Sequence, residues 1–329
     1  MFEKRSGLAF AGALAALLAA IAAASAQEWP TRPMTLEVPF AAGGGADVMG
    51  RILAAGLSEA LHQQVIVENI PGAGGMTGTA RVARAAPDGY QIALGSVGTH
   101  AYNQTLYKKP LYNAVTDFAP VALIAETPQV LVTRKDFPAA DLRQFIAYAK
   151  ANQAKMQYGS AGVGSPTHLA CALLNAVIGV EIAHIPYRGA GPTMQDLIAG
   201  RIDYQCPNTT VAVPQVESGT VKALAIFTRE RSPLLPDLPS THEQGLTDFE
   251  ASIWYALFLP KGTPAAIVAK LHDAIFAAVA TPAIEQRLHE IGATVVTEER
   301  RSPDYLRAFV ASEIEKWAAP IKAANLSGD

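Results

Sequence analysis

The sequence predicts an α/β fold of two lobes, each a central sheet flanked by helices, with a ligand cleft between the lobes. Three observations predict this fold class. Strand and helix patterns alternate along the chain, the alternation occurs in two segments of similar size, and glycine-rich loops follow several strands. The chain has 329 residues, and the roughly 300 that remain after the N-terminal segment fit two domains of ordinary size.

The N-terminal segment has the three-part pattern of a secretory signal. Lys4 and Arg5 give a positive start, residues 7–24 carry no charge, and small residues up to Ala26 form a cleavage site. The uncharged run is long enough for a membrane anchor, but it is rich in Ala and Gly and no basic cluster follows it. We therefore expect residues 1–26 to be a cleaved signal peptide and the mature chain to be periplasmic.

The composition excludes some partners and limits the covalent cross-links. The formal net charge is −3, and there is neither a basic block nor an interleaving of aromatic and basic residues, so no nucleic-acid partner is expected. The two cysteines, Cys171 and Cys206, permit one disulfide in an oxidising compartment. Both positions are expected near the cleft end of one sheet, which favours the bridge; two buried apolar thiols are the alternative.

The first half of the chain runs strand, helix, strand, helix, strand. This order predicts a parallel sheet covered by helices, because consecutive parallel strands need a crossover connection. The expected elements are strand 34–40, helix 48–62, strand 65–68, helix 77–86 and strand 91–94, with glycine-rich loops at 41–47 and 71–75.

The pattern then repeats, and the chain ends in helices. The expected extended segments are 121–124, 130–133, 156–158, 182–185, 202–206, 221–227 and 254–259, and the expected helices are 142–151, 168–177, 192–199 and 264–280, with further helices through Trp317. The sequence therefore predicts a discontinuous first lobe, 27–127 and 229–329, and a second lobe, 128–228. Crossings between the lobes are expected near 125–130 and 226–232.

Three strand-to-helix loops are candidate ligand sites. Such loops line the crevice of open α/β sheets, and the helix N-termini there offer unpaired N–H groups and a partial positive charge that suit a carboxylate. The first loop, 40–47, has three glycines that permit close backbone approach, and Asp47 is placed to cap the helix. A purely structural turn is the alternative for this loop.

The second loop, 158–168, combines three glycines with Ser160, Ser165 and Thr167 at a helix start. Its hydroxyls and free N–H groups suit an anion, but Ser165 or Thr167 is alternatively only an N-cap. His168 on a helix face is alternatively a hydrogen-bonded structural histidine.

The third loop, 187–191, carries one cation, Arg188, whose alternative role is an exposed salt bridge.

Motifs of common enzymes and metal sites are absent from the sequence. There is no G-x-S-x-G, no P-loop, no G-x-G-x-x-G, no H-E-x-x-H and no cysteine–histidine group with zinc spacing. We therefore expect no metal, no cofactor and no enzymatic activity. A hydrolase that uses Ser165 and His168 is the alternative, but no base or oxyanion motif supports it.

Segments along nearly the whole mature chain resemble the Bug family, the periplasmic solute receptors of tripartite tricarboxylate transporters. The segments that carry the resemblance are Trp29-Pro30-x-Arg32-Pro33, Val38-Pro39-Phe40-Ala41-Ala42-Gly43-Gly44-x-x-Asp47, Val67-Glu68-Asn69-x-Pro71-Gly72-Ala73-Gly74-Gly75, Pro87-Asp88-Gly89-Tyr90, Tyr158-Gly159-Ser160-x-Gly162-x-Gly164-Ser165-x-x-His168, Pro186-Tyr187-Arg188-Gly189 and Phe258-Leu259-Pro260-Lys261-Gly262-Thr263-Pro264. The resemblance implies a type II periplasmic-binding-protein fold and a ligand carboxylate held by loop backbone, hydroxyls and bridging water. The ligands of the family include di- and tricarboxylates, acidic amino acids, nicotinic-type acids and aromatic acids.

The resemblance also implies a set of ligand-binding positions. The residues of this chain that match them are Phe40, Ala41, Ala42, Gly43 and Asp47 in the first loop, Ser160, Gly164, Ser165 and His168 in the second, Tyr187 and Arg188 in the third, and Asp203, Asn208 and Thr209 further on.

One position departs from the family pattern. Many members have an Asp-Asn pair where this chain has Pro207-Asn208. An acidic residue there would suit a ligand amine, so its absence disfavours an amino acid. We expect a monomer that delivers a di- or tricarboxylate or an aromatic acid to membrane transporter subunits; a receptor that presents its ligand to a sensor kinase is the alternative.

Overall fold

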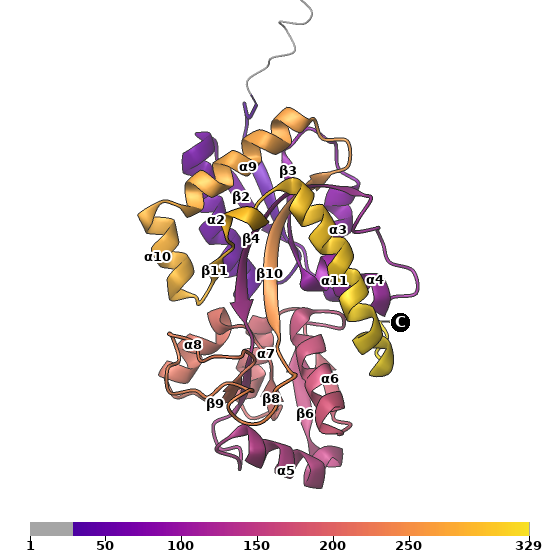
Figure 1. Cartoon of the computed structure of the whole chain (residues 1–329), viewed down its shortest axis with the longest axis vertical. Coiled ribbons are helices and arrows are strands. Elements are labelled where there is room, and N and C mark those ends of the chain that lie inside the picture. Colours follow the sequence, from indigo (N-terminus) through magenta and orange to yellow (C-terminus); the bar gives the residue numbers. More distant parts are fainter. Residues whose placement is uncertain (1–28, 329) are drawn as a thin grey trace, which may run out of the picture.

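The computed structural model describes residues 29–328 and contains two α/β lobes arranged along the long axis of the molecule (Figure 1). Each lobe has a central sheet with helices packed around it. The two-lobed α/β fold predicted from the sequence is therefore confirmed. The expected signal peptide, 1–26, lies outside the described residues.

The first lobe is built on a six-stranded sheet in the order β11-β4-β10-β3-β1-β2. β1 pairs in parallel with β2 and with β3, as the strand and helix alternation predicts, and β10 runs antiparallel between β3 and β4. The strands are β1 (Met34–Val38), β2 (Val65–Asn69), β3 (Gln91–Ser96), β4 (Phe118–Pro128), β10 (Ser252–Pro260) and β11 (Thr294–Val295).

The second lobe has a five-stranded sheet in the order β7-β6-β8-β5-β9. β6 pairs in parallel with β7 and β8, and β5 runs antiparallel to β8 and β9. The strands are β5 (Val130–Arg134), β6 (Gln157–Ser160), β7 (Ala183–Pro186), β8 (Tyr204–Gln205) and β9 (Val221–Ile226).

The helices flank these sheets (Figure 1). Those of the first lobe are α2 (Gly45–Leu61), α3 (Met76–Ala83), α4 (Asn103–Leu106), α9 (Ala265–Val279), α10 (Pro282–Glu290) and α11 (Pro303–Ala323), and those of the second are α5 (Leu142–Asn152), α6 (Pro166–Ile178), α7 (Ala190–Ile198) and α8 (Thr209–Glu217). Shorter helical turns are Ala73–Gly75, Gln153–Lys155 and Glu298–Arg300, with a π-helical turn at Gly98–Tyr102.

Like the single-turn α4, the longer helix α8 has no counterpart among the expected elements. It contains Pro214, which lacks an N–H for the helical ladder, and its β-branched residues favour strands. The strand expected at 202–206 is only Tyr204–Gln205. α8 contacts α2 and β4 of the first lobe as well as β9 of its own, so tertiary packing and not propensity decides the structure of this segment.

No single helix in residues 29–328 is long and apolar enough to cross a membrane. The helices α9 and α10 taken together have the length and apolar composition of a membrane span, but they meet at a bend of 75°.

Three chain segments are tied together where the lobes meet. The backbone N–H of Gln129 donates to Ala251 O (3.0 Å), that of Phe227 to Gln129 O (2.9 Å), and that of Ala251 to Phe227 O (3.0 Å). These short bonds connect the strands that enter and leave the second lobe. We expect this crossing to act as the hinge between the two sheets.

The segment between Phe227 and Ala251 packs against the second sheet, which corrects the expected lobe boundary. Ser240 bridges to Ile226 of β9, and the side chain of Gln244 bonds to Leu142 N and Leu224 O. Residues 229–250 therefore belong with the second lobe and not with the first. Proline-rich sequence without periodicity gave no sign of this, because the contacts are with distant strands.

A disulfide joins Cys171 of α6 to Cys206 after β8, with the Cα atoms 5.6 Å apart. Both residues are fully buried. The bond ties the helix that follows the second loop to the strand that leads into Asn208. It therefore holds together two of the segments that reach the cleft.

We expect a double variant, Cys171→Ala with Cys206→Ala, to be less stable by about 3–4 kcal/mol, because the bridge closes a loop with a sequence separation of 35 residues. Denaturant unfolding of wild type and variant measures the difference. Two reactive thiols in wild-type protein that was prepared and denatured without reductant would contradict the bridge.

Glu37 is a buried carboxyl group inside the first sheet. It lies on β1, its side chain is 1% exposed, and neither carboxyl oxygen has a hydrogen-bond partner among the described residues. Burial raises the pKa of Glu37 to about 8; the nearby Arg81 lowers it and Glu68 raises it, both by less. The folded protein therefore holds a proton on Glu37 at neutral pH.

This proton makes stability depend on pH. Between pH 4.5, the ordinary pKa, and about 8, the folded state binds more protons than the unfolded state, so stability falls as the pH rises. We expect Glu37→Gln to remove this fall and to be more stable than wild type at pH 8, on the order of 3 kcal/mol. Denaturation curves across this range measure it, with Glu59→Gln, an exposed glutamate on α2, as control. Parallel pH profiles for wild type and Glu37→Gln would refute the assignment.

Candidate functional site

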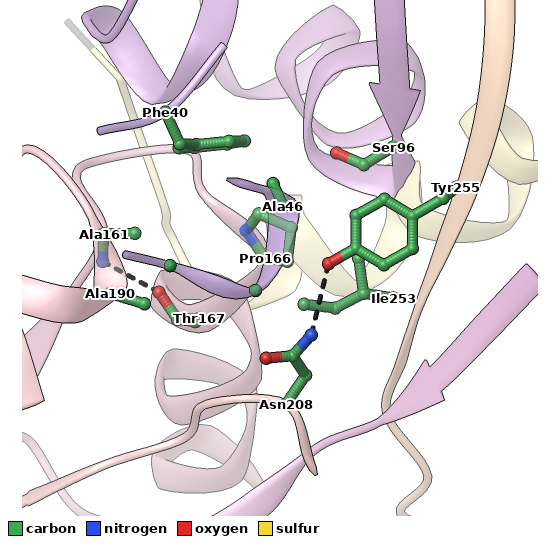
Figure 2. Close-up of a pocket in the computed structure, with 12 residues that line it drawn as sticks. Phe40, Ala46, Ser96, Ala161, Pro166, Thr167, Ala190, Asn208, Ile253 and Tyr255 are labelled. Atoms are coloured by element: carbon green, nitrogen blue, oxygen red, sulfur yellow. Dashed lines mark hydrogen bonds between the residues drawn. The ribbon is translucent and has the colours of Figure 1, made fainter. Parts of the chain in front are cut away.

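A small cavity lies between the lobes (Figure 2). Its volume is about 40 Å³, which corresponds to roughly three bound waters. Among the described residues, none that lines it carries a charged side chain. The lining residues are Phe40, Gly44, Gly45, Ala46, Ser96, Ala161, Pro166, Thr167, Ala190, Asn208, Ile253 and Tyr255.

Four helices begin at this cavity. Gly45 opens α2, Pro166 opens α6, Ala190 opens α7, and Asn208 immediately precedes α8. Within residues 29–328, no side chain caps the first N–H groups of α2, α7 or α8. Unpaired N–H groups and the positive ends of several helix dipoles therefore meet at one place, which favours an anion.

The first loop is held in shape by Asp47. Its carboxylate accepts hydrogen bonds from the N–H of Gly43 (3.0 Å) and from Asn69 Nδ2 (3.0 Å), and it pairs with Arg51. Burial alone would raise the pKa of Asp47, but the hydrogen bonds from Arg51, Gly43 and Asn69 outweigh it and lower the pKa. Gly43 has a φ of 80°, which favours glycine. Asp47 therefore orders the loop and does not line the cavity.

The rest of the first loop contacts the third loop across the cleft. Ala41 N–H donates to Arg188 O (3.3 Å). Ala42 lies beside Gly191, so close that a Cβ on Gly191 would touch its carbonyl. The side chain of Arg188 is exposed, and this residue contributes its backbone carbonyl to the contact.

Tyr187 also lies outside the cavity lining. Its hydroxyl donates to Asp196 (2.7 Å), and burial, more than this bond, raises the pKa of Tyr187 to about 12.

In the second loop, hydroxyl groups order the start of α6. Ser165 accepts from His168 N–H (3.3 Å) as the N-cap, and it lies 3.1 Å from Thr167 Oγ1. Thr167 accepts from Ala161 N–H (2.8 Å) and lines the cavity, whereas the fully buried Ser165 does not. In this structure Ser165 therefore acts as the N-cap of α6.

His168 and Ser160 order this loop but do not line the cavity. The Nδ1 atom of His168 accepts from Gly164 N–H (3.3 Å), and its ring stacks on His184 with the centroids 4.2 Å apart. Ser160 Oγ contacts His184 Nε2 (2.6 Å). Burial lowers the pKa of His168 to about 3 and that of His184 to about 4, so both rings are neutral at physiological pH. His168 Nδ1 is directed to the backbone and not to Ser165, which leaves the hydrolase alternative without its base.

Two candidates lie away from the cavity. Asp203 accepts from Gln157 N–H (2.8 Å) and from Arg134 Nε (3.2 Å). Gln157 begins β6, whereas the second loop follows the other end of this strand, so the placement of Asp203 at the cleft is wrong. Thr209 donates to Ile291 O (2.9 Å) and joins α8 to the first lobe.

Of the three later candidates, Asp203, Asn208 and Thr209, it is Asn208 that lines the cavity. Its Nδ2 atom lies 3.2 Å from Tyr255 Oη and 3.1 Å from Thr127 Oγ1, so it connects the lobes (Figure 2). Of the other sequence-predicted residues, Phe40 lines the cavity as well.

Ser96, Ile253 and Tyr255 line the cavity but were not among the candidates. They lie on β3 and β10, and their position depends on how these strands pair. The one local signal is at Ser96, a polar residue at the end of an apolar strand. The remaining lining residues, such as Thr167 and Ala190, fall in or directly after the predicted loops.

The fold and the site together define a class of protein, the two-lobed solute-binding protein. Solved structures of this class are similar to the whole described chain. The periplasmic binding protein BugD is 40% identical, covers 91% of this chain and 99% of its own, and gives a TM-score of 0.88. MatC from Rhodopseudomonas palustris with bound malate is 40% identical, with coverages of 89% and 100% and a TM-score of 0.86. A Rhodopseudomonas palustris protein with adipate is 34% identical, with coverages of 91% and 99% and a TM-score of 0.86.

The family is defined by sequence as well. Residues 49–326 match the model of the tripartite tricarboxylate transporter family receptor. Protein BugT of Bordetella pertussis is 35% identical over 316 residues, which cover 96% of both chains. The chain therefore belongs to the tripartite tricarboxylate transporter receptor family, whose members are periplasmic solute-binding receptors, and the resemblance seen in the sequence is confirmed.

Proposed function

We propose that this chain captures a small carboxylate ligand between its lobes in the periplasm and delivers it to membrane transporter subunits. In this proposal residues 1–26 are removed as a signal peptide, and the mature protein acts as a monomer. The observation that carries the proposal is the convergence of four helix N-termini on one cavity without a charged side chain in its lining.

The ligand carboxylate is held by N–H groups at the start of α2 and α7 and by the hydroxyl of Thr167. Charge-assisted hydrogen bonds of this kind are stronger than neutral ones, and they need no Arg or Lys. Phe40 and Asn208 complete the contacts. The other sequence-predicted loop residues, such as Asp47 and Ser165, position the binding groups through the hydrogen bonds described above.

The ligand class is a carboxylic acid without an amine. Two relatives hold malate and adipate in their solved structures. In this chain Pro207 takes the place of an acidic residue, and the described lining offers no carboxylate that could pair with an ammonium group. Because an unpaired buried charge is costly, an amino acid is disfavoured relative to a di- or tricarboxylate.

A thermal-shift screen over carboxylates, followed by calorimetry on EDTA-treated protein, tests the proposal. We expect a di- or tricarboxylate to bind without added metal, and at 100 times its Kd to add about 2.7 kcal/mol of stability. Binding that is lost after EDTA and returns with a divalent ion would contradict a metal-free site. Failure of every carboxylate to bind would overturn the proposed function.

Capture also requires that the lobes close about the hinge at Gln129, Phe227 and Ala251. A Cβ on Gly45, in the first lobe, would collide with the side-chain amide of Asn208, in the second. We therefore expect Gly45→Ala to bind the selected carboxylate at least tenfold more weakly and to keep its unfolding free energy, because the clash exists only between closed lobes.

Small-angle scattering distinguishes closure from folding. Saturating ligand should reduce the radius of gyration of wild type but leave Gly45→Ala unchanged. Ala55→Gly, in the middle of the same helix, is the control: it should lose helix stability and still close. Equal compaction of Gly45→Ala and wild type would count against closure at this contact.

A further inference from the structure

Ser96 has a buried hydroxyl group that the described structure leaves without a partner. Its backbone N–H donates to Thr99 Oγ1 (3.0 Å) and its carbonyl accepts from the same hydroxyl (3.2 Å). The side chain is different: the residue is 2% exposed, it lines the cavity, and its Oγ atom has no hydrogen-bond partner within residues 29–328. Such a group costs free energy unless something else bonds to it.

Tyr255 lies directly across from Ser96 on the neighbouring strand. The two residues are register partners in the antiparallel pairing of β3 and β10. Cβ atoms of directly opposite residues are about 4.5–5.5 Å apart and lie on the same face of the sheet. Both side chains line the cavity, and Asn208 Nδ2 lies 3.2 Å from the hydroxyl of Tyr255.

These three polar groups lie on one side of the cavity. Figure 2 shows Tyr255 between Ser96 and Asn208, and Ala161 and Ala190 on the opposite side. A ligand whose first carboxylate lies at the N-terminus of α7, beside Ala161 and Ala190, therefore presents its far end to Ser96. The amide N–H groups of Asn208 are engaged by Thr127, Thr210 and Tyr255, and because the hydroxyl of Tyr255 accepts from Asn208, its own proton is available to an acceptor. The absence of acidic side chains from the described lining also favours an acceptor there over an ammonium group.

We infer that Ser96 recognises the second acceptor group of the ligand. The cleft then selects an acid with oxygen acceptors at both ends over a monoacid of equal length. A ligand with a second carboxylate offers the buried Ser96 hydroxyl an acceptor. A ligand that ends in a methyl group does not, and it therefore binds more weakly. This inference rests on the proposed function, since it assigns the far end of the same ligand.

The test compares matched acids on matched variants. Succinate with butyrate, and adipate with hexanoate, differ by one carboxylate at equal chain length. Affinities are measured by calorimetry for wild type, Ser96→Ala and Ser58→Ala. Ser58 is the control because its hydroxyl bonds within the first lobe, to Ala54 O (2.7 Å) and Val65 N (2.9 Å), away from the cavity.

We expect Ser96→Ala to bind the preferred diacid roughly tenfold more weakly or worse, the loss of one hydrogen bond to a charged group. Its monoacid affinity should change by less than about twofold. The free Ser96→Ala protein should melt no lower than wild type, because the Ser96 hydroxyl has no hydrogen bond to another residue of 29–328 that the substitution would remove. Ser58→Ala should show the opposite pattern, with a lower melting temperature and unchanged selectivity.

Three results would overturn the inference. Equal weakening of diacid and monoacid would make Ser96 a general packing residue, and unchanged diacid affinity would remove it from the site. In both cases wild-type binding of carboxylates, and with it the proposed function, still stands. If wild type binds none of the four acids, the inference fails; the proposed function fails with it only if no other carboxylate of the thermal-shift screen binds.

Discussion

The structure depends on the alignment of helix N-termini at one edge of each sheet. In an α/β lobe the strand, the loop and the following helix place unpaired N–H groups at the carboxyl end of the strand. In this chain α2 of the first lobe and α6, α7 and α8 of the second begin at the same cavity. Three of these helices lack a side-chain cap in the described structure. Their N–H groups are therefore available to a ligand.

Many of the polar side chains near the cleft keep these N–H groups in place. Asp47 fixes the first loop, Ser165 and Thr167 fix the second, and the neutral ring of His168 supports it from behind. A binding site that is ordered before the ligand arrives loses less conformational freedom on binding. Polar residues in a glycine-rich loop thus contribute to affinity without contact with the ligand.

The two lobes are joined by the chain crossings between them and by hydrogen bonds across the cleft. Backbone bonds among Gln129, Phe227 and Ala251 fix the crossing, and the segment that precedes Ala251 stays with the second lobe. Asn208, Ala41, Thr209, Thr210 and Tyr107 make hydrogen bonds from one lobe to the other. Because these contacts join groups on different lobes, their formation and loss can be coupled to a bound ligand.

The sequence by itself determined the order of strands and helices, the two lobes and the three glycine-rich loops, because these features follow from local periodicity and glycine content. It also included Phe40 and Asn208 among the ligand-binding candidates. Only the tertiary structure decided that Asp203 lies at the far end of its strand, and that Ser96 and Tyr255 meet inside the cleft. The reason is physical: strand order and register bring distant residues together through long-range hydrogen bonds, and no local pattern encodes which strands become neighbours.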